Sequence, residues 1–286
     1  MSNLFSGLDA LGLGPLENID VYSSENTNGK AGGDKNVSSA SAKPKMVEAD
    51  VIFDKTFTCP VCDKEFKSKN VKTGKVKLLS ADSDLRPKYQ LVDSLKYDAV
   101  VCPYCGYAAL NRFFNYMTGA QAKLIKAQIS ANFKGISQDG DIYTYDDAIM
   151  RHKLALVSTI VKRGKTSEKA YTCLKLAWMY RGKAESLPSD TPDYDKVKKE
   201  LAGEELDCIK NAYDGFLNAF SKETFPMCGM DENTVTYLAA DLARRCGKYE
   251  EASRWISKVL TSRDANERIK TKAREIKDLI RLGNKE

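Results

Sequence analysis

The sequence is poor in the residues and motifs on which most enzyme chemistry depends. It contains one histidine, His152, so it cannot build a histidine-rich catalytic metal site or two separate histidine-dependent centres. It also lacks a glycine-rich phosphate-binding loop, a dinucleotide-binding fingerprint and a nucleophile elbow. We therefore expect a protein that is not an enzyme, with His152 as a half-buried helix residue.

Long apolar runs are absent as well. No stretch approaches the ~20 apolar residues that a membrane-spanning helix needs. The first residues do not show a basic region followed by an apolar core, which is the pattern of a secretory signal. These absences predict no membrane insertion and a cytoplasmic location, where a reducing environment favours thiolate–metal chemistry over disulfides.

The composition is that of an ordinary globular protein, with 42% hydrophobic and 29% charged residues and a formal net charge of +6. Residues 23–46 are rich in Ser, Asn, Gly, Lys and Ala, as in a flexible linker. Before them, Leu4, Leu8 and Leu11 would share one face of a helix. We expect residues 1–50 to be a disordered tail with this short amphipathic segment. The alternative is that the segment folds against a partner or against the protein's own body.

Four of the eight cysteines form two matched pairs. They lie in Cys59-Pro60-Val61-Cys62 and in Cys102-Pro103-Tyr104-Cys105-Gly106. Two thiols that are two residues apart can point at one centre, so the two turns supply the four sulfurs of a closed tetrahedral zinc site. Disulfides, a redox dithiol and buried thiols are the alternatives. We predict one structural Zn²⁺, with no open position for water, bound by Cys59, Cys62, Cys102 and Cys105.

The residues beside these cysteines suit two similar turns. A proline follows each first cysteine and fixes the φ angle there. Gly106 can adopt the left-handed conformation that turns backbone N–H groups toward sulfur. Asp63, which tolerates this conformation better than most residues do, occupies the matching place after the first pair.

Strand-like patterns surround the two cysteine turns, and they predict that residues 51–119 form a small zinc-ribbon-like β domain. The expected strands lie over 51–57, around Phe66, over 71–79 and over 97–101. The charged run 82–89 between them predicts a salt-bridged loop, a polar recognition surface or a solvated loop.

From residue 120 onward, apolar residues recur at helical spacing. This periodicity predicts antiparallel helical hairpins over 120–286, including a helix that Gly182 ends, a long helix over 195–220 and a helix capped by Asp231. Residues 237–242 followed by 247–252 are similar to a tetratricopeptide repeat. The predicted fold class is therefore α+β, with a zinc-ribbon-like β domain followed by an all-α, tetratricopeptide-like helical-hairpin domain.

Five segments carry a family resemblance. They are Cys59-Pro60-Val61-Cys62, Asp82-Ser83-Asp84-Leu85-Arg86-Pro87, Cys102-Pro103-Tyr104-Cys105-Gly106-Tyr107-Ala108, Leu176-Ala177-Trp178-Met179-Tyr180-Arg181 and Arg244-Arg245-Cys246-Gly247-Lys248-Tyr249-Glu250-Glu251-Ala252. Together they resemble a bacterial family catalogued as domain of unknown function 2225, over about residues 50–280. The resemblance implies a zinc-ribbon-like head on a tetratricopeptide-like body, and it implies no known activity.

We expect a non-enzymatic, zinc-binding scaffold or adaptor whose helical body binds a protein partner. The predicted contact residues are Trp178, Arg181, Arg244 and Arg245, because Trp and Arg are enriched at binding hot spots and guanidinium pairs bidentately with carboxylate. The alternative is that Trp178 belongs to the core and that Arg244 and Arg245 pair with Asp241 and nearby glutamates.

A cluster of lysines supports a different function. Its members are Lys64, Lys67, Lys69, Lys72, Lys75 and Lys77. A basic strand pair beside a zinc ribbon can bind nucleic acid, so a zinc-ribbon nucleic-acid-binding protein is the alternative to the scaffold. A solvated strand edge that resists aggregation is the other interpretation of the same cluster.

Overall fold

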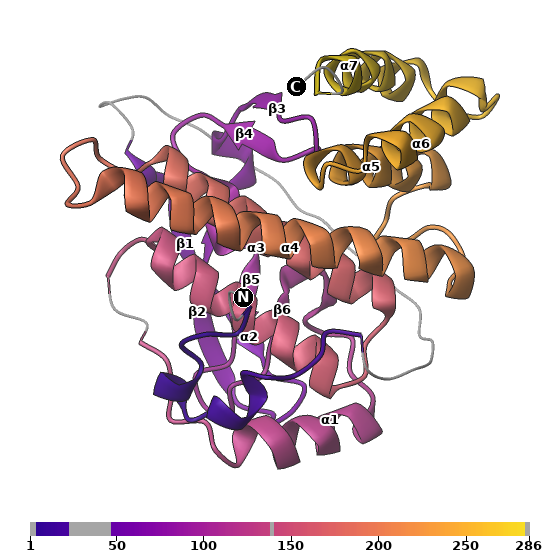
Figure 1. The fold of residues 1–286 in the computed structure, drawn as a ribbon. Coiled ribbons are helices and arrows are strands. Elements are labelled where there is room, and N and C mark those ends of the chain that lie inside the picture. Colours follow the sequence, from indigo (N-terminus) through magenta and orange to yellow (C-terminus); the bar gives the residue numbers. More distant parts are fainter. Residues whose placement is uncertain (1–3, 23–46, 138–139, 284–286) are drawn as a thin grey trace.

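The structure, a computed structural model, describes residues 4–22, 47–137 and 140–283. Within these residues, antiparallel strand pairs precede the long helices, so the fold is α+β as predicted (Figure 1). The pairs are β1 (Ile52–Thr58) with β2 (Glu65–Val71), β3 (Leu78–Ala81) with β4 (Pro87–Tyr89), and β5 (Ala99–Val101) with β6 (Ala108–Leu110). The first cysteine turn connects β1 to β2, and the second connects β5 to β6.

The α-helices of the described residues follow the predicted hairpin order. They are α1 (Gly119–Ile125), α2 (Tyr145–Val161), α3 (Thr166–Glu185), α4 (Tyr194–Lys222), α5 (Glu232–Arg245), α6 (Tyr249–Thr261) and α7 (Glu267–Gly283). Helix α3 packs along α4, and α5 packs on α6, which in turn packs on α7 (Figure 1). The Asp231 side chain accepts a hydrogen bond from the Thr234 N–H and starts α5, as predicted.

The expectation that Gly182 ends a helix is wrong, because α3 continues to Glu185. Gly182 lies inside the helix, and a Cβ atom at this position would collide with the ring of Tyr145 on α2. The glycine therefore serves the close packing of α2 on α3, and the helical hydrogen bonds of a long, buried helix outweigh its low helix propensity.

One hydrophobic core runs through most of the molecule. The same cluster of buried side chains contains the cysteine turns, strands β5 and β6, and inward-facing residues of α2 to α7. Strands β5 and β6 pack directly on α2, and the Ala108 N–H donates a hydrogen bond to the buried Ser158 Oγ at 3.1 Å. The predicted boundary after residue 119 therefore does not divide the core.

Residues 4–22 belong to this core, which corrects the expectation of a disordered tail for this part of the chain. Phe5, Leu8, Leu13 and Val21 are buried against the body. The Lys153 ammonium donates to the Ser6 carbonyl at 2.7 Å and anchors the segment to α2. Burial of these side chains supplies the stability that a short segment with several glycines lacks as a free helix. The predicted linker, residues 23–46, lies outside the described residues.

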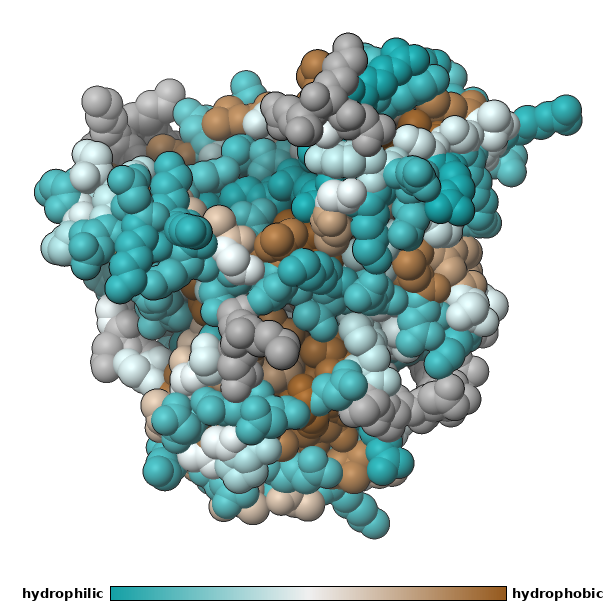
Figure 2. All heavy atoms as spheres, viewed as in Figure 1, coloured by the Kyte–Doolittle hydropathy of each residue, from teal (hydrophilic) through white to brown (hydrophobic). Residues whose placement is uncertain are grey.

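The surface in Figure 2 is mainly hydrophilic, with apolar side chains gathered in smaller patches. One patch lies below the middle of the view, where Figure 1 shows the N-terminal segment with parts of α1 and α2. Among the described helices, none combines the length and the apolar character that crossing a membrane requires.

Candidate functional site

Two similar turns hold the four paired cysteines. In each turn the carbonyl of the first cysteine accepts a backbone hydrogen bond from the residue four positions later. Asp63 N–H donates to Cys59 O, and Gly106 N–H donates to Cys102 O. Asp63 and Gly106 have φ angles of 58° and 73°, so both adopt the left-handed conformation that the sequence analysis assigns to these two places. This geometry bends the backbone at each turn so that both cysteines of a pair face the same side.

The structure brings the four predicted ligands together. All four Sγ atoms of Cys59, Cys62, Cys102 and Cys105 lie within 4.8 Å of one another. Two distances between the turns, Cys59–Cys105 and Cys62–Cys102, are 3.5 and 3.7 Å. A tetrahedral site with Zn–S bonds of about 2.3 Å requires sulfurs about 3.8 Å apart, so the donor set fits such an ion in number, element and spacing. The four cysteines can therefore hold a metal ion.

Thiols this close influence one another's protonation. Hydrogen bonding with the neighbouring thiols lowers the pKa of Cys102 well below its usual range. The same contacts with Cys102 raise the pKa values of Cys59 and Cys105. Four sulfurs at these distances can all be thiolates only when a cation neutralises them, and a metal supplies that charge. Backbone N–H groups of Val61, Cys62, Tyr104 and Cys105 also point at sulfur and favour the thiolate.

The second cysteine turn is attached to the helical part of the molecule. A Cβ atom on Gly106 would come within 2.6 Å of the Phe133 ring, so the second cysteine turn lies directly against Phe133. The Ser130 hydroxyl donates a hydrogen bond to the Cys105 carbonyl at 2.9 Å. A metal ion bound by the four cysteines would therefore link the β1–β2 pair to the β5–β6 pair, whose turn packs against the helical part.

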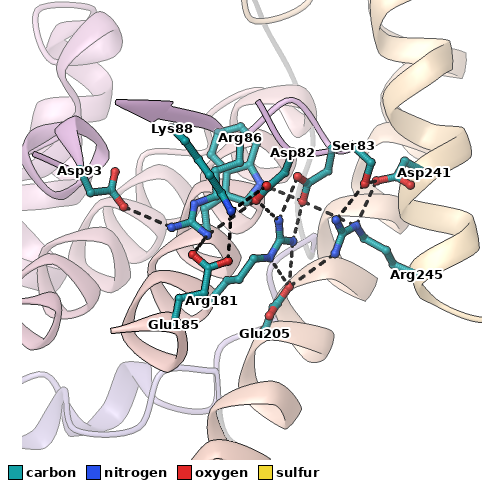
Figure 3. A network of polar contacts seen from close by, with 12 residues as sticks. Asp82, Ser83, Arg86, Lys88, Asp93, Arg181, Glu185, Glu205, Asp241 and Arg245 are labelled. Atoms are coloured by element: carbon teal, nitrogen blue, oxygen red, sulfur yellow. Dashed lines mark hydrogen bonds and ion pairs between the residues drawn. The ribbon is translucent and has the colours of Figure 1, made fainter. Parts of the chain in front are cut away.

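A second constellation lies where the loop between β3 and β4 meets α3, α4 and α5 (Figure 3). We call it the charge network. It consists of Asp82, Ser83, Asp84, Arg86 and Lys88 of the loop and β4, Asp93, and Arg181, Glu185, Glu205, Asp241, Arg244 and Arg245 of the helices. The charged run 82–89 thus forms a salt-bridged loop, one of the arrangements that its composition allows.

The centre of the charge network is the pair of Asp84 and Arg181. The Arg181 guanidinium binds both carboxylate oxygens of the fully buried Asp84, at 2.6 and 3.0 Å. Burial by itself opposes ionisation of Asp84, but the hydrogen bonds and the charge of Arg181 lower its pKa below the usual value. On α4, Glu205 accepts a hydrogen bond from the Arg181 Nε at 2.8 Å. One arginine therefore joins the loop to two helices.

The structure gives intramolecular partners to the residues predicted to bind a protein. The Trp178 indole N–H donates to Asp84 at 3.0 Å, and Arg181 binds the same carboxylate. The Nε atoms of Arg244 and Arg245 donate to the buried Asp241 at 2.8 and 3.0 Å. This is the alternative that the sequence analysis leaves open for the arginines. The contacts with Asp84 arise because the chain's own loop between β3 and β4 lies on the face of α3 and α5.

Some features of the site carry no clear signal in the sequence. Burial of Asp84 and Asp241 depends on contacts between residues 158 positions apart, such as the hydrogen bond from Ser83 Oγ to Asp241 at 2.8 Å. His152 is fully buried rather than half-buried, and burial lowers its pKa to about 4, so the imidazole is neutral at physiological pH. Its Nδ1 lies 2.7 Å from the Ala148 carbonyl, as expected for a helix residue that bonds back to its own helix.

A family model described as "Uncharacterized protein conserved in bacteria (DUF2225)" matches residues 52–280, which include both cysteine turns and the charge network. Comparison with curated proteins and with solved structures gives no match. The match begins at β1 and ends within α7, so it spans the strand pairs and the helices together. The chain therefore belongs to this uncharacterised bacterial family.

Proposed function

We propose that this protein is a non-catalytic, zinc-binding scaffold or adaptor, in which one structural Zn²⁺ joins the two cysteine turns and the helical body binds a protein. The observation that carries the proposal is the closed set of four cysteine sulfurs within 4.8 Å. Four thiolates complete a tetrahedral zinc site and leave no position for a water or a substrate. Thiolate ligands favour zinc over magnesium or calcium, and the spacing matches zinc.

The arrangement of the helices supports the interaction part of the proposal. Hairpins α3–α4 and α5–α6 pack side by side with short connections, which is the construction of helical repeats that bind proteins. Apolar side chains remain exposed on two elements at the top of Figure 1, namely Leu78 and Leu79 on β3 and Leu279 and Leu282 on α7. Exposed leucines in pairs are the kind of residue that a protein partner covers.

The metal is tested by purifying the full chain without added metal and measuring zinc per chain. We expect one Zn²⁺, released by a strong chelator together with a large fall in melting temperature that added Zn²⁺ reverses. Less than half an equivalent of any metal in chains with all four thiols reduced would refute the zinc site.

The interaction is tested with surface variants, because variants of the charge network would disturb the fold. Leu279→Ser/Leu282→Ser removes two exposed leucines of α7 and should keep the melting temperature of the native chain. Crosslinking in the host cell, followed by reconstitution with the purified captured protein, should show loss of binding in this variant. The matched control is Lys277→Ser/Asp278→Ser on the same helix, which should bind as the native chain does. Equal binding by both variants excludes this face of α7, and the same comparison with Leu78→Ser/Leu79→Ser then tests β3.

Nucleic-acid binding remains the second candidate because Lys64, Lys67, Lys75 and Lys77 are exposed. The other two lysines of the cluster contact acidic residues, since the Lys69 ammonium lies 3.7 Å from the Asp54 carboxylate and Lys72 donates to the Asp50 carbonyl. This candidate requires a mobility shift on mixed DNA or RNA that weakens steeply with salt. The shift should disappear in Lys64→Glu/Lys67→Glu and persist in Lys196→Glu/Lys199→Glu on α4. No shift at low salt rejects it.

A further inference from the structure

A cavity of about 380 Å³ lies between the segment 84–98 and the helices α3 and α5. Its volume is within the range of small-molecule binding sites, which begins at about 300 Å³. The cavity adjoins the charge network, because Asp84 of the network lines the cavity and accepts a hydrogen bond from another lining residue, Trp178. It uses none of the cysteines and is separate from the metal centre.

Besides Asp84, whose carboxylate is paired with Arg181, two residues of opposite charge line this cavity. The Lys175 ammonium of α3 lies 2.9 Å from the Asp98 carboxylate, which comes just before β5. The lysine side chain is 9% exposed, whereas a quarter of the Asp98 side chain remains accessible. The ammonium also lies 5.2 Å from the ring centroids of Tyr171 and Trp178. The rings orient the ammonium and shield it from water on their side.

Both members of the pair keep their charge despite being buried. Burial opposes the charged form of Lys175, but the facing carboxylate raises its pKa above the usual value. Burial likewise opposes ionisation of Asp98, and Lys175 lowers its pKa. A lysine ammonium has three N–H donors and a carboxylate has two oxygens, so one ion pair does not exhaust either group.

The charges restrict the kind of ligand that fits. A ligand with only a carboxylate would approach Lys175 but be repelled by Asp98, and a ligand with only an amine would meet the reverse. A zwitterion places its carboxylate at Lys175 and its ammonium at Asp98, which gives a ring of alternating charges. Apart from Asp84 and Ser94, the remaining lining residues are aliphatic or aromatic and include Leu174, Met230 and Leu238. We propose that this cavity binds a free α-amino acid with an apolar side chain.

Ligand binding in this cavity would be coupled to the packing of the segment 84–98 against the helices α3 and α5. One wall comes from the segment 84–98 that precedes the second cysteine turn, and the other comes from α3 and α5. A ligand that contacts both walls stabilises their association and raises the melting temperature of the whole chain.

The experiment titrates the zinc-loaded full chain with L-leucine, L-methionine and L-phenylalanine, using calorimetry and melting temperature. N-acetyl-L-leucine and L-leucinamide are the matched probes, because each lacks one of the two charges. We expect at least one free amino acid to bind and both derivatives of leucine to bind at least about tenfold more weakly than leucine, since each loses a charge-assisted hydrogen bond. No binding of any free amino acid at about 10 mM, or equal binding of the derivatives, would overturn the proposal.

Two variants locate the binding in this cavity. Lys175→Met/Asp98→Asn removes both charges together, so that neither is left buried and unpaired. It should keep its zinc and lose amino-acid binding at least tenfold. The control is Lys162→Met/Glu168→Gln, which removes another buried lysine–carboxylate pair, at 2.8 Å, outside the cavity, and should bind as the native chain does. If the cavity variant does not fold, Ser94→Trp narrows the cavity from the part-buried Ser94 and should also abolish binding. Full binding in a folded cavity variant or in Ser94→Trp would place the amino acid elsewhere and overturn the assignment.

Discussion

The candidate metal centre, formed by the four paired cysteines, and the charge network both join distant parts of this chain, but they do so by different physics. The metal centre takes four sulfurs from two short turns, and each turn positions its pair by local backbone geometry. The charge network takes its members from the segment 82–93 and from three helices, with partners up to 162 residues apart. The cysteine cluster requires only that the two turns meet, whereas the charge network requires the packed helices.

This difference has an energetic consequence. Metal–thiolate bonds of a bound ion would form only in the folded chain and would contribute directly to its folding free energy. Buried ion pairs gain Coulomb energy but lose hydration, so a complete network contributes little net stability even though breaking one member is costly. We therefore expect a bound metal to supply stability, and the charge network to determine where the loop between β3 and β4 lies on α3 and α5.

The largest expected effect is at the metal centre. Cys59→Ser should release the zinc and unfold the chain at moderate temperature, because structural zinc contributes an apparent ~10–16 kcal/mol in zinc-finger peptides. Metal analysis and calorimetry measure both outcomes. Cys173→Ser is the control, since Cys173 is equally buried but far from the cluster in sequence and is not part of it. Full zinc content in Cys59→Ser would contradict the ligand set.

The charge network should show a smaller effect that a second substitution reverses. Arg181→Met leaves the buried Asp84 without its main partner and should lower the free energy of unfolding by about 3–5 kcal/mol. Arg181→Met/Asp84→Asn should recover much of this loss, because the amide oxygen still accepts from Trp178 and no charge remains unpaired. Urea titration provides the measurement. Arg281→Met, at an exposed pair with Asp278, should change stability by less than about 0.5 kcal/mol.

The N-terminal segment provides an apolar comparison with these polar contacts. Leu8→Ala should lower the free energy of unfolding by about 2–5 kcal/mol, because the fully buried side chain leaves a cavity. Leu282→Ala, at a side chain that is 63% exposed, should have almost no effect. If thermal melts show no difference between the two variants, residues 4–22 do not contribute to the core.

The two cysteine turns give the smallest and most local comparison. Gly106→Ala should lower stability by about 1–3 kcal/mol, because alanine is strained at a φ of 73° and its Cβ would press on the Phe133 ring. Asp63→Gly should raise stability by less than about 1 kcal/mol, because relief of the milder strain at a φ of 58° is partly offset by the greater flexibility of the unfolded chain. If calorimetry shows that the two substitutions change stability in opposite directions, the turns are equivalent. Changes in the same direction would show that the surroundings of each turn dominate.

The sequence by itself determined the cysteine turns, the strands that enter them and most of the helices. Two residues between paired thiols, with Asp63 or Gly106 after them, specify a turn whose geometry extends over a few bonds. Helical periodicity likewise reflects local spacing, and α4 at Tyr194–Lys222 agrees closely with the predicted 195–220. The helix start at Asp231 was predictable because a cap needs only the next three residues.

Tertiary structure decided the features that depend on what lies across from a residue. A glycine that could stop a helix is retained inside α3, since Tyr145 fills the space beside Gly182. The apolar residues of 4–22 are compatible with disorder until a complementary surface buries Leu8 and Leu13. The sequence predicts Arg181 to be a surface binding residue, whereas in the structure the loop between β3 and β4 covers it. The pairing of Lys175 with Asp98 has no local signal in the sequence. The physical reason is common to all of these: burial and charge pairing depend on the distance between residues in space, and that distance is set by the packed core rather than by neighbours in the chain.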